Sequence, residues 1–309
     1  MIMILSASVS ACSREITTRA GDLSRIEGEL DFGGLKREYV LLVPPDLTLA
    51  DSYALVLALH GGGGDARRMC SLRGGIQEFA ADEKFFVLCP AGVDRHWNDG
   101  RAIDRWRAHA DDIDDVGFLQ NLVSLIIEQH PVDPSRVFVT GMSNGGKMSL
   151  RLACEQADIF RASAPVIASM PADLRCEPVE PISILIMNGT ADPLVPWQGG
   201  HVMAFGRSLG AVWSTPRTME FWVDQNHCDP EPERSHLPDS TPSDGSSIEI
   251  ERYSNCQAGV QVTLFSVNGG GHTWPGGAQY LPEFLIGSTN RDAHAGELIW
   301  NFFEQVASQ

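Results

Sequence analysis

The sequence lacks the residue spacings that hold metal ions, and it has few basic residues. It contains no Cys-x-x-Cys pair and no Cys/His spacing typical of zinc, so we expect neither a metal ion nor a cofactor. Its 23 Lys and Arg stand against 40 Asp and Glu, which gives a net charge of −17. Such a surface repels a phosphate backbone, so nucleic acid is not an expected partner. After the N-terminal residues, no segment predicts a transmembrane helix.

The N-terminal residues resemble the end of a bacterial export signal. Residues 1–11 are apolar and small, and residues 9–12 (Val-Ser-Ala-Cys) resemble a lipobox in which Cys12 would carry a lipid. The apolar run is short and no basic residue precedes it, so a disordered N-terminus is the alternative. We expect a secreted or periplasmic protein, with a lipid anchor at Cys12 as one form of export.

Seven cysteines are present, and setting Cys12 aside leaves six. Disulfides in an oxidising compartment are the simplest interpretation of these six residues, although six cysteines allow many pairings. Cys228 and Cys256 form the preferred pair, because they flank one polar stretch at 229–247. Weaker pairs are Cys154 with Cys176 and Cys70 with Cys89, and reduced buried cysteines are the alternative for these four.

The chain of 309 residues, 43% of them hydrophobic, is long enough for one large core. We expect a signal-like segment at 1–12, an N-terminal tail at 13–36 and one catalytic domain at 37–309. Apolar, β-branched runs predict strands, and amphipathic stretches between most of them predict helices. Alternating strands and helices predict a mainly parallel α/β sheet covered on both faces, with a loop at 229–247. The predicted strands are 38–43, 53–59, 85–89, 136–140, 182–187 and 260–267, and the predicted helices are 116–127, 144–155, one that opens at Thr215-Pro216, and 298–306.

Ser143 lies in Gly-Met-Ser-Asn-Gly at 141–145, directly after the predicted strand 136–140 and before the predicted helix 144–155. This strand–turn–helix context is the nucleophile elbow of serine hydrolases, in which small neighbours let a tight turn expose the serine. The pattern alone is weak, because Gly-Arg-Ser-Leu-Gly at 206–210 also matches it. There the preceding residues 201–205 form a poor strand, so we expect Ser208 to be a loop or helix-end serine.

Asp192 and His272 follow predicted strands in the order expected of an α/β-hydrolase triad. The ends of parallel strands meet at one edge of the sheet, so both should approach Ser143. His272 would take the serine proton and Asp192 would orient the imidazole. Taken singly, Asp192 has the alternative of a turn carboxylate before proline and His272 that of a loop histidine; their occurrence together favours the triad. Asp224, inside a helix, and His294, at the head of the last helix, are less well placed.

A glycine run at 61–64 follows His60 at the end of the predicted strand 53–59. Such a run can offer backbone N–H groups to a developing oxyanion, and the expected donors are Gly62 and Asn144. A flexible turn is the alternative. A phosphate-binding loop is less favoured, because no Gly-Lys-Ser/Thr follows the glycines.

Several blocks together resemble esterases related to poly(3-hydroxybutyrate) depolymerases and feruloyl esterases. The matching blocks are residues 59–62, 114–118, 131–137, 140–146, 188–192 and 270–275. The resemblance implies a secreted serine esterase with Ser143, Asp192 and His272 as its triad, supports the Cys228–Cys256 bridge, and places Trp274 at the acyl pocket or in the packing around it. Trp97 and Trp106 either stack on substrate or pack.

Two departures from that family bear on the substrate. Gly62 stands where depolymerase-type members often carry cysteine, but only the backbone N–H would be used there. No appended polymer-binding domain follows the last helix, so a small-molecule or polysaccharide-linked ester (feruloyl, acetyl or short hydroxyalkanoate) is the expected substrate. Depolymerisation of poly(3-hydroxybutyrate), or peptide hydrolysis by the same triad, is the alternative. We expect a monomer or weak oligomer.

Overall fold

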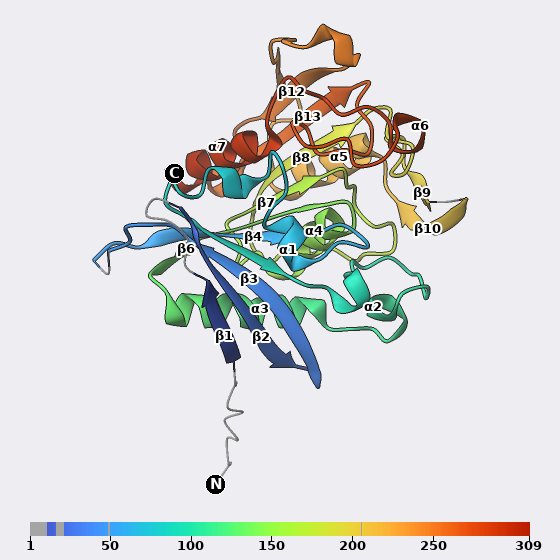
Figure 1. Cartoon of the computed structure of the whole chain (residues 1–309). Coiled ribbons are helices and arrows are strands. Elements are labelled where there is room, and N and C mark those ends of the chain that lie inside the picture. The colour runs from blue at the N-terminus through green and yellow to red at the C-terminus, as the bar shows by residue number, and fades with distance from the viewer. Residues whose placement is uncertain (1–10, 17–21, 49, 205) are drawn as a thin grey trace.

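The computed structural model describes residues 11–16, 22–48, 50–204 and 206–309, and for 11–16 the backbone alone. Most of the predicted export segment, residues 1–10, lies outside this part. Its centre is an eleven-stranded sheet in the order β1-β2-β3-β5-β4-β6-β7-β8-β13-β12-β11, with a separate two-stranded hairpin, β9–β10 (Figure 1). The strands are β1 (Ala11–Ile16), β2 (Ser24–Phe32), β3 (Leu35–Val43), β4 (Tyr53–Leu59), β5 (Phe86–Pro90), β6 (Val132–Met142), β7 (Ala162–Val166), β8 (Ser183–Gly189), β9 (Gly200–Ala204), β10 (Arg207–Val212), β11 (Glu233–His236), β12 (Ser247–Tyr253) and β13 (Val262–Asn268).

Helices cover both faces of this sheet. Within the described residues, none of them is long and apolar enough to cross a membrane. The α-helices are α1 (Ala66–Met69), α2 (Arg107–Ala110), α3 (Asp115–Gln129), α4 (Asn144–Glu155), α5 (Thr215–Gln225), α6 (Glu283–Ile286) and α7 (Ala295–Ala307), and the short 3-10 helices are η1 (Ile76–Glu78), η2 (Val93–Arg95), η3 (Pro242–Asp244) and η4 (Gln257–Gly259).

The middle of the sheet is parallel and its margins are antiparallel. Strands β5, β4, β6, β7, β8 and β13 run in one direction, whereas β1, β2 and β3 on one side and β12 and β11 on the other pair antiparallel. Every residue of β4 and β8 is buried, as strands covered on both faces require. The predicted α/β-hydrolase fold with a mainly parallel sheet is confirmed.

The period-two alternation of each strand divides the core into two layers. In β4, Leu55 and Leu57 pack with α3, α4 and α5 on one face, whereas Val56 packs with α1 and α7 on the other. The first layer includes Leu119 and Trp222, and the second includes Phe303, which stacks on Phe138 at a centroid distance of 4.6 Å. The sheet is therefore held rigidly between two apolar layers, and its strand ends are fixed relative to one another.

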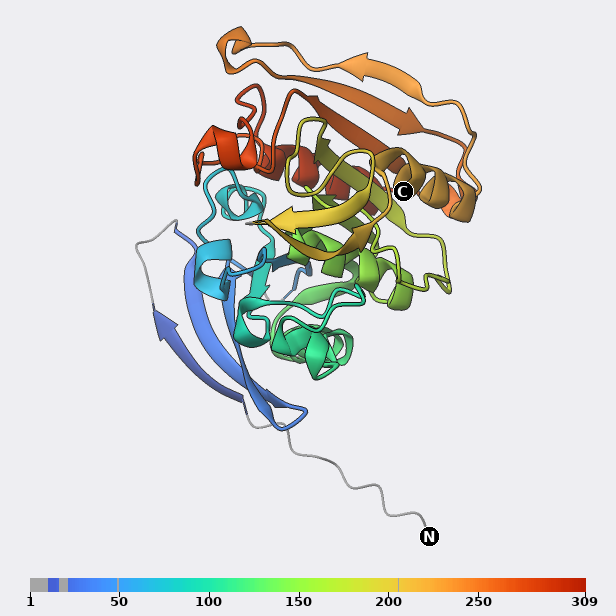
Figure 2. The ribbon, with the colours of Figure 1, turned by 90° about the vertical axis from the view of Figure 1, so that its right-hand side faces the viewer.

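Most predicted elements are present, with 53–59 and 144–155 matched to the residue. The predicted tail at 13–36 is wrong, because β2 pairs with β3 along its whole length. This strand lies near the margin and is only half-buried, so it shows no continuous apolar run. The predicted loop at 229–247 is also wrong in part, because β11 pairs with β12 and extends the sheet. Figure 2 shows this extension at the top and the β9–β10 hairpin in front of the core.

Three disulfides link helices, loops and one strand within the described residues. They join Cys70 to Cys89, Cys154 to Cys176, and Cys228 to Cys256, which are the three pairs predicted. The last closes a segment 28 residues long that includes the β11–β12 hairpin. Each bridge lowers the entropy of the unfolded chain, so all three stabilise the fold.

Candidate active site

Ser143 occupies a strained turn between β6 and α4. Its backbone has φ 54° and ψ −111°, a conformation in which a non-glycine residue is uncommon. The flanking glycines permit the turn: a Cβ on Gly141 would lie 2.5 Å from the Gly145 carbonyl oxygen, and a Cβ on Gly145 would lie 2.3 Å from the Leu59 carbonyl oxygen. The turn lifts the serine above the sheet and places it at the N-terminus of α4, where the helix dipole favours negative charge.

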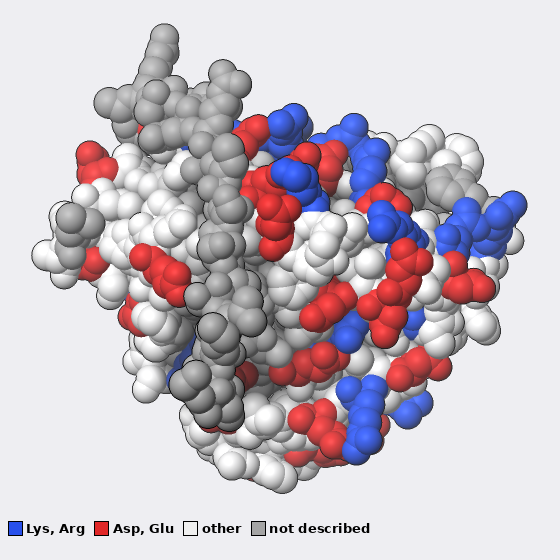
Figure 3. Space-filling model, turned by 90° about the horizontal axis from the view of Figure 1, so that it is seen from below, with Lys and Arg blue, Asp and Glu red and all other residues white. Residues whose placement is uncertain are grey.

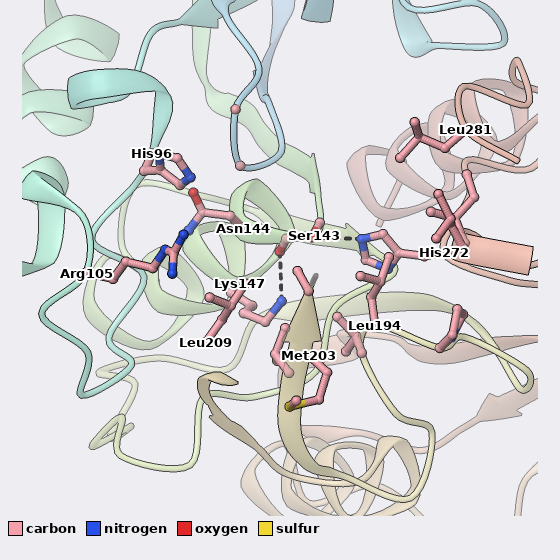
Figure 4. A pocket seen from close by; sticks show the side chains of 18 of the residues that line it. His96, Arg105, Ser143, Asn144, Lys147, Leu194, Met203, Leu209, His272 and Leu281 are labelled. Atoms are coloured by element: carbon pink, nitrogen blue, oxygen red, sulfur yellow. Dashed lines mark hydrogen bonds between the residues drawn. The ribbon is translucent and has the colours of Figure 1, made fainter. Parts of the chain in front are cut away.

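A continuous hydrogen-bonded relay connects three loops at the carboxyl ends of β6, β8 and β13. The Ser143 hydroxyl lies 2.9 Å from His272 Nε2 (Figure 4). His272 Nδ1 lies 2.7 Å from Asp192 Oδ2. A carboxylate only accepts, so Nδ1 donates to Asp192, and Nε2 is then the acceptor for the serine hydroxyl. The structure thus brings together the three residues that the sequence singled out.

Backbone groups fix the acid and the base. Asp192 Oδ1 accepts hydrogen bonds from the N–H groups of Leu194 and Val195, at 2.8 and 2.9 Å, while Tyr280 donates to the His272 carbonyl at 2.8 Å. The loops carrying Asp192 and His272 also touch directly, since a Cβ on Gly189 would lie 2.3 Å from the Gly270 carbonyl oxygen. The carboxylate therefore has one oxygen committed to its own loop and the other to the imidazole.

The glycine loop after β4 lies against the elbow. A Cβ built on Gly62 would lie 3.8 Å from Asn144 Cβ, so the two expected N–H donors are neighbours. In the described part of the chain, neither N–H donates to a protein acceptor. His60 holds the loop: its Nε2 accepts from the Gly92 N–H at 3.0 Å, and burial lowers the pKa of its imidazole to about 4.

The Asn144 side chain anchors the neighbouring loop. Its Oδ1 accepts from the Trp97 N–H at 2.8 Å, and its Nδ2 donates to Asp99 at 2.7 Å. Asp99 is fully buried and also binds Arg101 and His109. Burial acts to raise the pKa of Asp99, but Arg101 and His109 outweigh it and hold that pKa well below its usual range. The carboxylate is therefore ionised and fixes the residue that follows the nucleophile.

Known esterases are similar in sequence to this chain, one of them over most of its length. The inferred esterase NocK of Nocardia uniformis subsp. tsuyamanensis is 32% identical over 291 residues, which cover 91% of this chain and 83% of that protein. A model of the family described as esterase PHB depolymerase matches residues 37–169. The chain belongs to the esterase family related to poly(3-hydroxybutyrate) depolymerases and feruloyl esterases, and it is a carboxylic ester hydrolase.

Other relatives match this esterase over shorter stretches or in fold alone. Feruloyl esterase B of Piromyces equi is 33% identical over 165 residues, which are 52% of this chain and 29% of that protein. Among solved structures, an acetyl xylan esterase from Aspergillus awamori has a TM-score of 0.56 at 13% identity and covers 95% of this chain and 99% of that one. At that identity the likeness shows the fold only.

A cavity of about 610 Å³ opens beside Ser143 of this esterase. Its apolar wall comes from the β9–β10 hairpin, from the loop after Asp192 and from the α6 region, none of which the sequence had indicated as pocket elements. The apolar lining side chains are Leu194, Val195, Val202, Met203, Leu209, Leu281, Leu285 and Ile286. On the opposite side His96 stacks on Trp106, with ring centroids 4.2 Å apart, and both line the cavity.

The two tryptophans expected to bind substrate lie elsewhere, which corrects the prediction. Trp97 is fully buried and donates from its indole to the His60 carbonyl at 3.0 Å. Trp274 is 2% exposed and donates to the Gly74 carbonyl at 2.8 Å. Neither lines the cavity. Nearness to His272 in sequence was a poor guide, because the loop turns the Trp274 side chain into the core.

The second Gly-x-Ser-x-Gly match also differs from expectation. Ser208 lies in β10, not in a loop or at a helix end, and its hydroxyl contacts His201 Nδ1 at 2.8 Å. The residues 201–205 that read as a poor strand include most of β9, which pairs with β10. Both side chains are exposed and no elbow is present, so Ser208 lies outside the site. Asp224 and His294 lie in α5 and at the N-cap of α7, as predicted.

Lys147 is the residue at this site that sequence reasoning missed. It lies in the first turns of α4, is 1% exposed and lines the cavity. Burial, followed by the charge of Arg101, lowers the pKa of its ammonium to about 7. A lysine four residues after the nucleophile, on the buried side of a short amphipathic helix, was the available signal.

Proposed function

We propose that the protein is an exported serine esterase that cleaves carboxylic esters through an acyl-enzyme on Ser143. The observation that supports this most strongly is the relay from Asp192 through His272 to Ser143, with contacts of 2.7 and 2.9 Å. All three groups already lie at hydrogen-bonding distance, which is the geometry that nucleophilic catalysis by serine requires.

Each step of the reaction has a group positioned for it. His272 Nε2 takes the hydroxyl proton as Ser143 Oγ attacks the ester carbonyl. The tetrahedral oxyanion accepts hydrogen bonds from the N–H groups of Gly62 and Asn144, and Asp192 stabilises the imidazolium. The proton then passes to the alkoxide, so the alcohol leaves. Water repeats the sequence on the acyl-enzyme and releases the carboxylic acid.

The cavity favours small or aryl esters as the substrate class. Its lining is mainly apolar, and the relatives include proteins named feruloyl esterase and a fold neighbour named acetyl xylan esterase. We place feruloyl, acetyl or short hydroxyalkanoate esters first. Poly(3-hydroxybutyrate) is the second candidate, because Leu285 lines the cavity and the adjacent Phe284 is 84% exposed, which leaves apolar surface for a polymer chain.

Export and domain organisation belong to the same proposal. Three disulfides support folding in an oxidising compartment, outside the cytoplasm. We infer a single catalytic domain that begins no later than β2, because this strand is part of the central sheet. A lipid on Cys12 would lie in β1, at the margin of the sheet farthest in strand order from β8 and β13.

The test compares two serines that share the same five-residue pattern. Ser143→Ala should lower 4-nitrophenyl acetate turnover by about 10⁴-fold or more, leaving only the residual rate from binding and oxyanion stabilisation. Ser208→Ala, in the hairpin, should keep turnover within about twofold, since no relay involves it. Full turnover by Ser143→Ala would refute the proposal. Methyl ferulate, acetylated xylan and hydroxybutyrate oligomers assayed side by side would then rank the substrates.

A further inference from the structure

Lys147 is a buried cation without a carboxylate partner. Its side chain is 1% exposed, and among the described residues no Asp or Glu forms an ion pair with it. Its one hydrogen bond runs from Nζ to the Ser143 carbonyl, at 3.4 Å. Figure 4 shows the side chain running beneath the nucleophile with its Nζ toward Ser143. An ammonium has three donors, so most of its hydrogen-bonding capacity is unused.

The cavity around Lys147 carries an excess of positive charge. Arg101, Arg105 and Lys147 line it, and no Asp or Glu does so within the described residues. Arg101 is neutralised by Asp99 at 2.7 Å, but Arg105 has no ion pair in the described part of the chain and is exposed at the cavity. This local excess occurs in a protein of net charge −17, whose acidic and basic groups are interleaved on the face seen in Figure 3.

Packing alone does not account for a lysine at this position. Burial of an unpaired ammonium opposes folding, and an unbranched, uncharged methionine could line the cavity at this position without that cost. The neighbouring charges do not offset this cost of burial. Arg101 repels the Lys147 ammonium, and the attraction of Asp99 and Asp192 is too weak to restore the lysine pKa to its usual value. A charged side chain that destabilises the fold and lies beside the nucleophile is typical of a functional site. We therefore expect the Lys147 ammonium to bind an anionic group of a ligand.

We propose that Lys147 and Arg105 bind a carboxylate of the substrate, so that the enzyme prefers esters carrying a free carboxylate a few bonds from the scissile carbonyl. Hemiesters of short dicarboxylic acids fit this description. Lys147 holds the carboxylate beside Ser143, Arg105 neutralises it from the cavity wall, and the apolar wall packs on the methylene groups. The inference rests on the proposed esterase function and specifies its substrate.

The experiment compares two ethyl esters that share a five-carbon acyl chain, monoethyl glutarate and ethyl pentanoate. Their kcat/KM values are measured by proton release at about pH 6.5, where the free carboxylate is ionised. The wild-type ratio should favour the glutarate ester by about tenfold or more, the size expected of a charge-assisted hydrogen bond. Lys147→Met should lower this ratio about tenfold, and Lys147→Arg should restore part of it.

Two further variants, Arg105→Gln and Arg107→Gln, serve as a second test and as a control. Arg105→Gln removes an exposed side chain, so it tests the same preference without a folding risk and should lower the ratio about threefold. Arg107→Gln, an exposed arginine two residues away that pairs with Asp111, should leave the ratio unchanged. A ratio within twofold of wild type in both Lys147→Met and Arg105→Gln would overturn the inference.

Failure of the inference is distinguishable from failure of the esterase proposal. Each variant is also treated with a fluorophosphonate, which labels an activated serine regardless of carboxylate recognition. Labelling together with hydrolysis of ethyl pentanoate, but no glutarate preference, would reject the carboxylate subsite and leave the esterase proposal standing. Absence of both labelling and hydrolysis in the wild-type enzyme would reject the two proposals together.

Discussion

The strand-end side of the site and the cavity wall differ in whether their polar side chains have partners within the protein. At the strand ends, the polar side chains of Asp192, His272 and Asn144 each have hydrogen-bond partners within the protein. On the cavity wall, Lys147 and Arg105 form no ion pair with any carboxylate that the structure describes, and the remaining surface is mainly apolar. The first side is complete without a ligand, whereas the second is incomplete.

This difference indicates that the strand-end side performs the hydrolysis of any bound ester, whereas the cavity wall selects which ester binds. A relay that already has its geometry needs little from the substrate beyond a carbonyl at the correct place. Cations left without partners gain their partners only when a ligand arrives, so they discriminate between ligands. Changes at the strand ends should therefore lower turnover of every ester, and changes on the wall should alter the ratio between esters.

The largest effect is expected from removal of the base. His272→Ala should lower kcat by about 10⁴- to 10⁶-fold for all esters, because within the described part of the chain the Ser143 hydroxyl hydrogen-bonds to His272 alone. Steady-state hydrolysis of 4-nitrophenyl acetate measures it. His201→Ala, which removes the imidazole that contacts Ser208, is the matched control and should act as wild type. A loss of kcat for one ester only would contradict the assignment of the strand-end side to a step that all esters share.

Loss of the charge on the acid is expected to be next in size. Asp192→Asn keeps the shape but permits the wrong imidazole tautomer, so kcat should fall by about 10³- to 10⁴-fold. The loss should be shared equally by monoethyl glutarate and ethyl pentanoate, since the relay does not contact the substrate carboxylate. A change in the ratio between these two esters would show that the two sides of the site are not separate.

The Asn144 side chain tests the support beneath the oxyanion donors. Asn144→Ala keeps the backbone N–H but leaves the Trp97 N–H without its acceptor and Asp99 without one of its donors. We expect a loss of about 10- to 100-fold in kcat and about 2 kcal/mol of stability. Thermal unfolding beside ester turnover measures both. Wild-type kcat in a destabilised variant would assign the side chain a purely structural role.

The substrate preference that the cavity wall confers should depend on pH, because the charge of Lys147 does. The ammonium of Lys147 loses its proton as pH rises through about 7, so the preference for monoethyl glutarate should fall about fivefold between pH 6 and pH 8.5. Any pH dependence of the chemical steps that the two esters share cancels in the ratio. The ratio of kcat/KM across pH tests this, and a flat ratio in the wild type would contradict it.

The same buried cation predicts a stability gain on its removal. The folded protein holds the Lys147 proton less tightly than the unfolded chain, so its folding cost is full below about pH 7 and disappears above the usual lysine pKa. Lys147→Met should therefore be more stable than wild type by about 1–3 kcal/mol near neutral pH. Chemical denaturation at neutral and alkaline pH measures the gain, which should shrink as pH rises.

The smallest effect on turnover should come from the disulfide farthest in strand order from the nucleophile. Replacement of Cys228 and Cys256 by alanine removes a bridge that closes 28 residues, which should cost about 3 kcal/mol of stability. Ester hydrolysis at a temperature where the variant is folded should stay within about twofold, because no site residue lies in the closed segment. A large loss of kcat would show that the sheet margin positions the site.

The sequence predicted the strand-end side well, because local patterns determine it. A strand followed by a glycine-flanked serine places Ser143, and the predicted strands that end at 187 and 267 place Asp192 and His272 on the same edge. Two strands were harder to predict for different reasons. β2, near the margin, alternates polar and apolar residues and is only half-buried. β7, in the middle of the sheet, is built mostly from Ala, Ser and Pro rather than from large β-branched residues.

The cavity wall was not predictable, because distant segments form it and no local pattern marks their meeting. The β9–β10 hairpin and α6 contain nothing in sequence that aims them at Ser143. Trp274 was placed wrongly for the same reason, since a position two residues after His272 does not determine which way a loop side chain turns. The role of Lys147 could not be predicted without knowing that the β9–β10 hairpin lines the same cavity as this residue.

The relay itself is tested most directly by locating the residue that reacts as the nucleophile. A fluorophosphonate reacted with the wild-type protein, followed by peptide mass spectrometry, should place one label on Ser143, and His272→Ala should greatly slow the labelling. A label on Ser208, or equal labelling rates with and without His272, would contradict the account.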